Sequence, residues 1–252
     1  GTYIQDARHR ARQEGLKKRI AEAEEEPALP SGGRKRGATL LAVDRRVPDR
    51  ESHRRQAEEK PVMLGKYAAL YAENHDLAGW ISIEGMKIDY PVMQCEDDEY
   101  YLHHDYYGEE SRYGCLYVRG QADLEEGTNF IIYGHNMKDG SMFGDLDYYL
   151  KEKFYQEHPN ISFDTLYEER VYEIVAVFRS RVYNGDDDVF KYYQFYEADT
   201  QEEFEDFYEN IKALSLYDTG VEAQFGDTFL TLSTCAYHVK DGRLAVVAKR
   251  IK

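Results

Sequence analysis

Cysteine is scarce in this 252-residue sequence, which contains only Cys95, Cys115 and Cys235. So small and odd a number argues against the disulfide framework of small secreted domains and leaves at least one thiol free. No two cysteines have the Cys-x-x-Cys spacing of a zinc or redox site, and the histidines are scattered apart from His103-His104. Adjacent side chains diverge in helices and in strands, so this pair seldom chelates one ion. We therefore expect no structural metal and no cofactor.

Long apolar runs are also missing, since no stretch approaches the roughly 18 residues that a membrane-spanning helix needs. The chain opens on Gly1-Thr2 rather than on methionine, and we expect it to be a fragment of a longer protein. An anchor missing from these residues can still be present in the parent protein.

Basic residues are in the minority, with 32 Lys and Arg against 48 Asp and Glu and a formal net charge of −16. Residues 1–60 carry 15 basic and 11 acidic side chains, a net charge of +4, so residues 61–252 carry −20. Such an acidic body repels nucleic acid and anionic lipid head groups. We exclude nucleic acid as a partner and expect cationic or neutral partners such as peptides and amines.

Hydrophobic residues make up 42% of the chain and aromatic residues 14%, which is enough to bury a core. The first 60 residues lack the regularly spaced apolar residues of a core-forming segment. Residues 3–26 are rich in helix formers, but their apolar positions are too sparse for a core-facing stripe. We predict a solvated or frayed helix there, with a juxtamembrane stalk as the alternative, and a Pro- and Gly-rich linker at 27–37.

The remaining sequence begins with an amphipathic helix at 62–74, whose apolar residues recur at intervals of three and four. Short apolar runs separated by turn residues then predict a β-barrel or sandwich rather than a parallel α/β sheet. Helical insertions are predicted at 142–150 and 202–214. The six predicted strands are 87–92, 115–118, 129–133, 171–183, 228–234 and 244–251.

Three side chains near strand ends are candidates for chemistry. Cys235 ends a strand-like run, and a strand end can hold a nucleophilic thiol rigidly in a cleft. Arg243 opens the next strand after a turn, so we expect it beside Cys235, where a guanidinium can stabilise an oxyanion. His135 follows another apolar strand, and imidazole takes and returns protons near neutral pH. Taken singly, each residue also fits a structural role: an inert thiol, a surface ion pair or a structural histidine.

The motifs around these residues resemble those of the sortase family, and within it class B. Thr231-Leu-Ser-Thr-Cys235, Tyr133-Gly-His135-Asn136-Met137 and Gly242-Arg243-Leu-Ala-Val-Val match its three catalytic motifs in order and approximate spacing. The likeness extends from about residue 62 to the end of the chain. Supporting matches are Asp76-Leu-Ala-Gly-Trp-Ile, Ile88-Asp-Tyr-Pro-Val-Met-Gln and Tyr101-Leu-His-His-Asp.

The resemblance implies a mainly β fold, an eight-stranded β-barrel with an N-terminal helical extension and a helix inserted before the cysteine strand. Residues 61–252 would form the class B catalytic domain, and residues 1–60 a charged, partly helical arm or stalk. The parent protein would be anchored at the extracellular face of a Gram-positive membrane. Such enzymes cleave a C-terminal sorting signal after Thr, hold the product as a thioester and pass it to an amine of peptidoglycan or of a pilin.

By the same resemblance, Cys235 is the nucleophile, His135 the acid and base, and Arg243 the stabiliser of the acyl intermediate. A class B label favours an Asn-Pro-x-Thr signal over Leu-Pro-x-Thr-Gly. Class B implies no calcium requirement, although the acidic run at 186–188 is a possible site for that ion. The candidate substrate-binding residues are Ser233, Thr234, Tyr192 and Tyr193.

Two alternatives stay open. A cysteine peptidase that only hydrolyses such signals would share the thioester chemistry, with water in place of the amine. A non-catalytic surface scaffold could use the same barrel, although a chain that had lost catalysis should lack one of the three motif residues, and all three are present.

Overall fold

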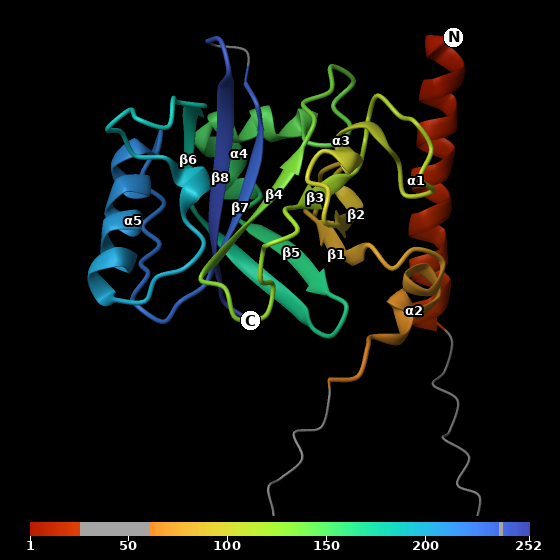
Figure 1. The fold of residues 1–252 in the computed structure, drawn as a ribbon, viewed down its shortest axis with the longest axis horizontal. Coiled ribbons are helices and arrows are strands. Elements are labelled where there is room, and N and C mark those ends of the chain that lie inside the picture. The colour runs from red at the N-terminus through yellow and green to blue at the C-terminus, as the bar shows by residue number, and fades with distance from the viewer. Residues whose placement is uncertain (26–60, 237–238) are drawn as a thin grey trace, which may run out of the picture.

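Eight strands close into a barrel in the computed structural model, which describes residues 1–25, 61–236 and 239–252 (Figure 1). The strand order around the barrel is β1-β2-β3-β4-β7-β8-β6-β5, so the expected mainly β, eight-stranded fold is confirmed. The strands are β1 (Leu77–Ser82), β2 (Asp89–Gln94), β3 (Leu116–Val118), β4 (Asn129–Gly134), β5 (Asn160–Thr165), β6 (Glu169–Arg181), β7 (Phe229–Cys235) and β8 (Gly242–Arg250).

Two of these strands, β1 and β5, are absent from the six predicted ones. Strand β5 is polar at most positions and buries Ile161 and Phe163 inside the barrel, so its apolar signal is confined to alternate residues. Strand β1 contains Gly79, where a side chain would collide with the backbone oxygen of Asp164 in β5. Glycine in a sequence usually predicts a turn, but here it lets two strands pack closely.

Strands β7 and β8 are buried on both faces, which explains their nearly continuous apolar sequences. Leu230 and Leu232 of β7 point into the barrel, whereas Phe229 packs outward. The outer layer is α5 (Gln201–Leu214), which begins at Thr200 with a capping box closed by Glu203. The helix predicted at 202–214 is thereby confirmed. Its apolar face consists of Phe204, Phe207, Tyr208 and Ile211.

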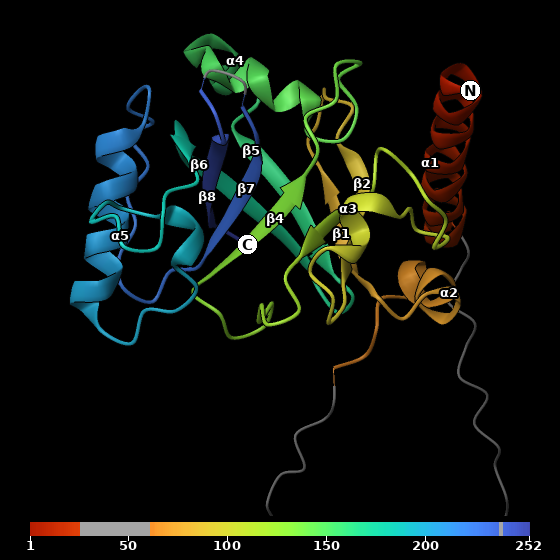
Figure 2. The same cartoon turned by 45° about the horizontal axis from the view of Figure 1, so that its top comes forward.

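A long helix, α1 (Thr2–Glu25), stands on the side of the barrel opposite α5, next to α2 (Gly65–Glu73) (Figures 1 and 2). The expectation of a solvated or frayed helix is wrong for one face of α1. His9, Gln13 and Leu16 are buried there, at intervals of four and three residues. Because two of these residues are polar, the face lacks an apolar stripe in the sequence. The helix predicted at 62–74 is confirmed by α2.

Short helical turns fill the connections: α3 (Tyr100–His103), the 3-10 helix η1 (Gly144–Leu150), α4 (Glu152–Glu157) and the 3-10 turn η2 (Tyr192–Gln194). The insertion predicted at 142–150 corresponds to η1. The linker predicted at 27–37 lies outside the described residues. Within the described ranges, no helix combines the length and the apolar character needed to cross a bilayer.

Candidate active site

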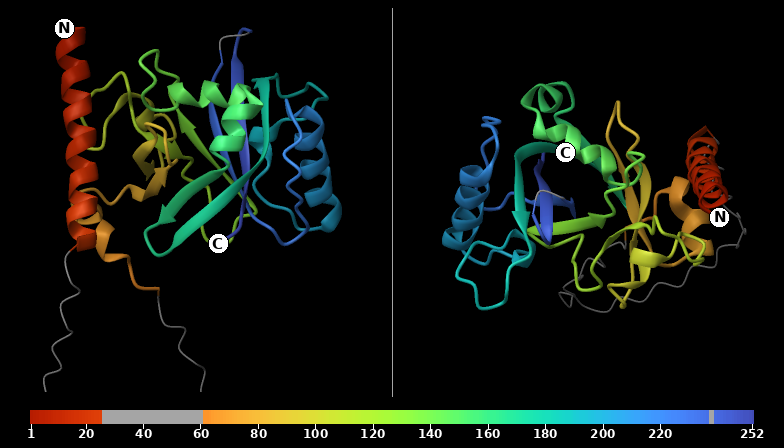
Figure 3. Two further views of the ribbon diagram at one scale, coloured as in Figure 1. Left: turned by 180° about the vertical axis from the view of Figure 1, so that it is seen from behind. Right: turned by 90° about the horizontal axis from the view of Figure 1, so that it is seen from above.

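The carboxyl ends of β4 and β7 meet at one rim of the barrel because these two strands are parallel. Their register pairs Gly134 with Thr234, so His135 and Cys235 each follow one member of that pair. Strand β8 begins at the same rim and pairs Arg243 directly with Cys235. The right-hand view of Figure 3 looks down on this rim. The structure thus brings together three candidate residues that span more than 100 positions of the sequence.

Cys235 is the last residue of β7 and is a free, half-buried thiol. Its main chain is held from two sides: the side-chain Nδ2 of Asn136 donates to its carbonyl oxygen over 2.9 Å, and the next residue, Ala236, donates its N–H to Gly242 over 2.9 Å. Cys235 therefore sits on a backbone that neighbouring strands fix, with its side chain still reachable.

Arg243 is half-buried and donates from Nη1 to the carbonyl of Gly242 over 2.9 Å. It forms no ion pair with any residue that the structure describes, so the alternative role in a surface ion pair finds no partner there. A guanidinium next to the thiol in the β7–β8 ladder offers its remaining N–H groups to a ligand. This arrangement suits a developing oxyanion on a carbonyl carbon bound to Cys235.

His135 is held by the backbone of α3. Its Nε2 lies 2.7 Å from the carbonyl oxygen of Leu102. A carbonyl oxygen can only accept, so Nε2 carries the proton in this contact, and the lone pair of the neutral ring is on Nδ1. The loop after the histidine is fixed as well, because Phe143 donates its N–H to the His135 carbonyl over 2.9 Å. This contact favours the tautomer with the proton on Nε2, which leaves Nδ1 as the ring atom with a free lone pair.

Asn136 is a site residue that our sequence reasoning quoted within a motif but assigned no role. Besides the bond to Cys235, its Nδ2 lies 3.4 Å from Oδ2 of Asp147 in η1. It therefore connects the loop after β4 to the end of β7. Its position directly after His135 was the one feature of the sequence that pointed to it. Its contact with Cys235 spans 99 positions and cannot be predicted from local sequence.

Of the four predicted substrate-binding residues, Ser233 and Thr234 directly precede Cys235 in β7, and Tyr192 contacts Ser233. Ser233, Thr234 and Tyr192 are each no more than 2% exposed. The hydroxyls of Tyr192 and Ser233 are 2.8 Å apart, and Thr234 donates to the Gly134 carbonyl over 2.7 Å. Tyr193 is half-buried, and its hydroxyl accepts from the N–H of Tyr183 over 3.0 Å. The structure thus brings Tyr192 to Ser233, and contact of the four residues with substrate stays a prediction.

Tyrosines and an arginine lie on the outer face of the barrel, beside the strands that carry the candidate residues. Tyr117 and Tyr133 stack with ring centroids 5.5 Å apart, and the guanidinium of Arg119 lies 5.4 Å from the Tyr133 ring. Burial raises the pKa of Tyr117 and of Tyr192 to about 12. These phenols therefore stay neutral near the thiol and offer hydroxyls and ring faces rather than charge.

Of the two adjacent histidines, His104 is held by the local fold. His104 stacks on Tyr100 with centroids 4.0 Å apart, and its Nδ1 lies 2.8 Å from the carbonyl of the same residue. Across the described ranges, no group of three His, Cys, Asp or Glu side chains is arranged to hold a metal ion.

Comparisons with known proteins agree with these motifs. The model of the sortase domain matches residues 81–251. The chain is 36% identical over 186 residues to Sortase B of Listeria monocytogenes, with 71% of each chain covered. It is similar to a crystal structure of sortase B from B. anthracis in complex with AAEK1, with a TM-score of 0.75, 28% identity and 99% of both chains covered.

A Staphylococcus aureus sortase B-substrate complex is similar to the same extent, with a TM-score of 0.75, 25% identity and 99% of both chains covered. The sortase domain spans well over half of this chain, and its relatives by sequence and by structure are class B enzymes. The chain therefore belongs to the sortase family, as a cysteine transpeptidase of class B.

Proposed function

We propose that this transpeptidase cleaves a C-terminal sorting signal after Thr and transfers the protein, by way of a thioester on Cys235, to an amine of peptidoglycan or of a pilin. The observation that carries the proposal is the common rim of β4, β7 and β8, where His135, Cys235 and Arg243 meet. The reaction needs a nucleophile, a proton carrier and an oxyanion stabiliser, and these three side chains supply one each.

In the first half-reaction, Sγ of Cys235 attacks the carbonyl carbon of the signal's Thr, and Nδ1 of His135 takes the thiol proton. The carbonyl oxygen becomes an oxyanion, which the guanidinium of Arg243 stabilises. Collapse of this intermediate breaks the peptide bond, and His135 returns the proton to the leaving amine. The product is a thioester between the Thr carbonyl and Cys235.

In the second half-reaction, a neutral amine attacks the thioester carbonyl and Nδ1 of His135 accepts the proton that the amine loses. The new amide forms as the thiolate leaves, and the proton on His135 returns to Cys235. Water in place of the amine would release the free acid, which is the activity of the alternative, a cysteine peptidase. The acidic body, with a net charge of −20 over residues 61–252, favours the approach of a cationic amine over that of an anionic acceptor.

We propose an Asn-Pro-x-Thr type of signal rather than Leu-Pro-x-Thr-Gly, because the relatives of this chain are class B enzymes. The likeness to a class B enzyme whose structure holds a substrate supports binding of a signal peptide in this chain. We also propose that the full-length protein is anchored at the extracellular face of a Gram-positive membrane, where sorting signals and cell-wall amines are both available.

The test is cleavage of quenched fluorescent Asn-Pro-x-Thr and Leu-Pro-x-Thr-Gly peptides, with and without hydroxylamine, and mass spectrometry of the products. The expected result is cleavage after Thr of the first peptide and a hydroxamate product when hydroxylamine is present. The matched controls are Cys235→Ala and Cys95→Ala, the latter removing a half-buried thiol away from the rim. Cleavage that persists in Cys235→Ala would overturn the mechanism, and an acid product alone would favour the peptidase.

A further inference from the structure

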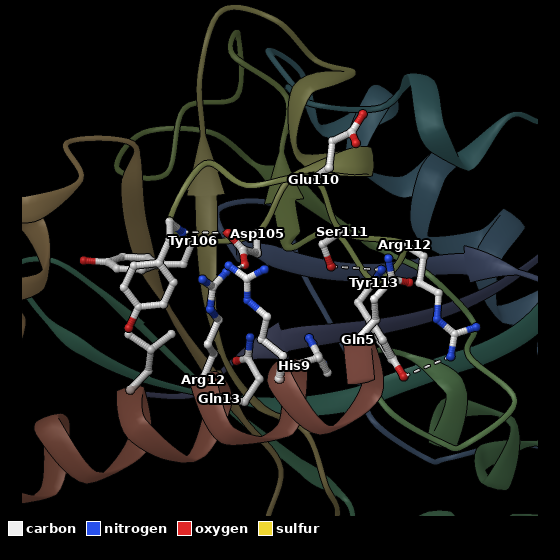
Figure 4. Close-up of a pocket in the computed structure, with 13 residues that line it drawn as sticks. Gln5, His9, Arg12, Gln13, Asp105, Tyr106, Glu110, Ser111, Arg112 and Tyr113 are labelled. Carbon is white, nitrogen blue, oxygen red and sulfur yellow. Dashed lines mark hydrogen bonds and ion pairs between the residues drawn. The ribbon is translucent and has the colours of Figure 1, made fainter. Parts of the chain in front are cut away.

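The N-terminal helix α1 contacts the loop of residues 104–113, which follows α3. Arg12, near the middle of α1, pairs with Asp105 (Figure 4). It also pairs with Glu109, whose carboxylate lies 2.9 Å from Nη2. Arg8, one turn earlier, pairs with Glu109 as well. Two arginines of one helix are thus directed at the carboxylates of one loop.

Asp105 lies near the start of that loop and is only 6% exposed. One of its carboxylate oxygens accepts from the N–H groups of Tyr107 and Glu109, at 2.9 and 3.1 Å, while the other faces Arg12. A buried carboxylate needs a countercharge, and Arg12 is its ion-pair partner in the described structure. The shape of the loop therefore depends on a residue of α1.

A second contact joins α1 to the far end of the loop. His9 stacks on Tyr113 with centroids 3.8 Å apart and planes 4° from parallel. The Tyr113 hydroxyl donates to Asp6 of α1 over 2.7 Å and also lies 3.3 Å from Asp139, in the loop that follows His135. Helix α1 thus touches, through one tyrosine, the two loops that flank the catalytic histidine.

The same loop fixes the carbonyl that holds His135. Leu102 lies in α3, and the residues on its two sides accept hydrogen bonds from the returning end of the loop. Ser111 donates to the His103 carbonyl over 2.8 Å, and Cys115 donates to the Tyr101 carbonyl over 2.9 Å. A shift of the loop would therefore move the Leu102 carbonyl relative to Nε2 of His135.

We propose that Arg12 is a positioning residue for His135. Through Asp105 it holds the loop of residues 104–113, the loop holds the Leu102 carbonyl, and that carbonyl keeps Nε2–H as the donor and Nδ1 as the proton-exchanging atom. Docking of α1 is then part of the catalytic arrangement as well as of the fold. The catalytic part of this inference rests on the proposed role of His135 as acid and base.

The helix also offers a matched control. Arg19, two turns after Arg12, pairs with Glu73 of α2 at 2.6 Å. This bidentate pair reaches the loop only where Glu73 lies 3.4 Å from the Tyr106 hydroxyl, and it does not involve Asp105. Arg12→Gln and Arg19→Gln each remove one ion-paired arginine from the same helix. A general loss of α1 docking would lower the activity of both variants alike. If Arg12 acts through Asp105, only Arg12→Gln should lose activity.

The experiment measures kcat and KM for the sorting peptide across pH 5 to 9 in the full chain, together with nitrogen-15 NMR of the histidine side chains. For Arg12→Gln we expect kcat to fall on the order of tenfold with KM nearly unchanged, because the contacts that orient a catalytic side chain typically contribute 10- to 100-fold. The histidine-dependent limb of the pH profile should shift, and the Nε2–H tautomer of His135 should lose population. Asp105→Asn should act in the same direction, and Arg12→Lys should recover part of the loss.

Equal kcat values and pH profiles in Arg12→Gln and the parent chain would overturn the inference, as would an equal loss in Arg19→Gln. The NMR arm needs no turnover, so it distinguishes failure of this inference from failure of the proposed function. If the parent chain cleaves neither peptide but Arg12→Gln still changes the His135 tautomer, the positioning path stands without the proposed substrate. An unchanged tautomer in Arg12→Gln would reject the path whatever the activity.

Discussion

The side-chain amide of Asn136 donates to the main-chain carbonyl of Cys235 over 2.9 Å, so the residue after the proposed acid and base holds the nucleophile's backbone. This contact ties the end of β4, which is followed by the proposed proton carrier, to the end of β7, which carries the proposed nucleophile. Because the contact joins the loop after β4 to the end of β7, a displacement of His135 would also displace Cys235.

Replacing Asn136 with Ala should lower kcat/KM for the sorting peptide on the order of tenfold, because the Cys235 backbone loses a donor and the thiol gains freedom. The measurement is steady-state cleavage of the fluorescent peptide. Asn210→Ala is the matched control, since Asn210 makes the same kind of amide-to-carbonyl contact, to Asp206 at 2.8 Å, on the exposed face of α5. Equal activities of the two variants would contradict the role given to Asn136.

Replacing Arg243 with Gln should lower kcat on the order of 100-fold, which is typical for loss of one oxyanion donor. Arg243→Lys should restore little, because an ammonium cannot reproduce the planar fork of a guanidinium. Arg179→Gln, at an exposed position of the neighbouring strand β6, serves as control and should leave kcat unchanged. Retention of more than half the parent kcat in Arg243→Gln would refute the stabilising role.

His9 should make the protein less stable in mild acid. Burial lowers the pKa of His9 from its ordinary 6.5 to about 4, the carboxylates of Asp139, Asp105 and Asp6 oppose this shift, and Arg112 reinforces it. The unfolded chain therefore binds a proton near pH 6.5 that the folded chain refuses until about pH 4. The free energy of unfolding should fall as the pH drops through this window, by at most about 3 kcal/mol, and should be insensitive to His9 above it.

Urea unfolding at pH 7.5 and pH 4.5 tests this prediction. His9→Phe keeps a ring on Tyr113 and should reduce the loss of stability between the two pH values. His75→Phe, at an exposed histidine that stacks on Tyr71, should leave that loss unchanged. Identical pH dependence in the parent chain and in His9→Phe would show that the stacked histidine does not titrate as described.

Tyr192→Phe should destabilise the fold by about 1 to 3 kcal/mol, because it leaves the buried hydroxyl of Ser233 without the partner at 2.8 Å. Combining it with Ser233→Ala should cost less than the sum of the two single changes. Denaturant unfolding of the three variants gives the coupling. Additive costs would contradict a shared hydrogen bond, and a raised KM for the sorting peptide in Tyr192→Phe would show that this hydroxyl contacts substrate.

The barrel strands with dense apolar sequence could be predicted closely, and β4, β7 and β8 were among them. Local hydrophobicity was sufficient there because both faces of these strands are buried. It was insufficient for β5, which alternates polar and apolar residues. It was also insufficient for α1, which docks through Arg12, His9 and Gln13 rather than through an apolar stripe.

The three candidate catalytic residues could be found because each ends or opens a strand within a short motif. Their supports could not, because these are long-range contacts: Leu102 with His135, and Asn136 with Cys235. A single sequence shows which residues can react, but the atoms that orient them belong to backbone carbonyls and amides whose partners emerge only from the closed barrel.

The parallel pairing of β4 with β7 joins residues 100 positions apart, Asn129 opposite Phe229. Contacts of such sequence separation form slowly, since a long loop must close before any pairing is gained. His135 and Cys235 therefore come together only after β4 and β7 are both present and the loop of about 100 residues between them has closed. A chain in which these pairings have not formed holds a thiol but no assembled reaction centre, so peptide cleavage requires the closed barrel.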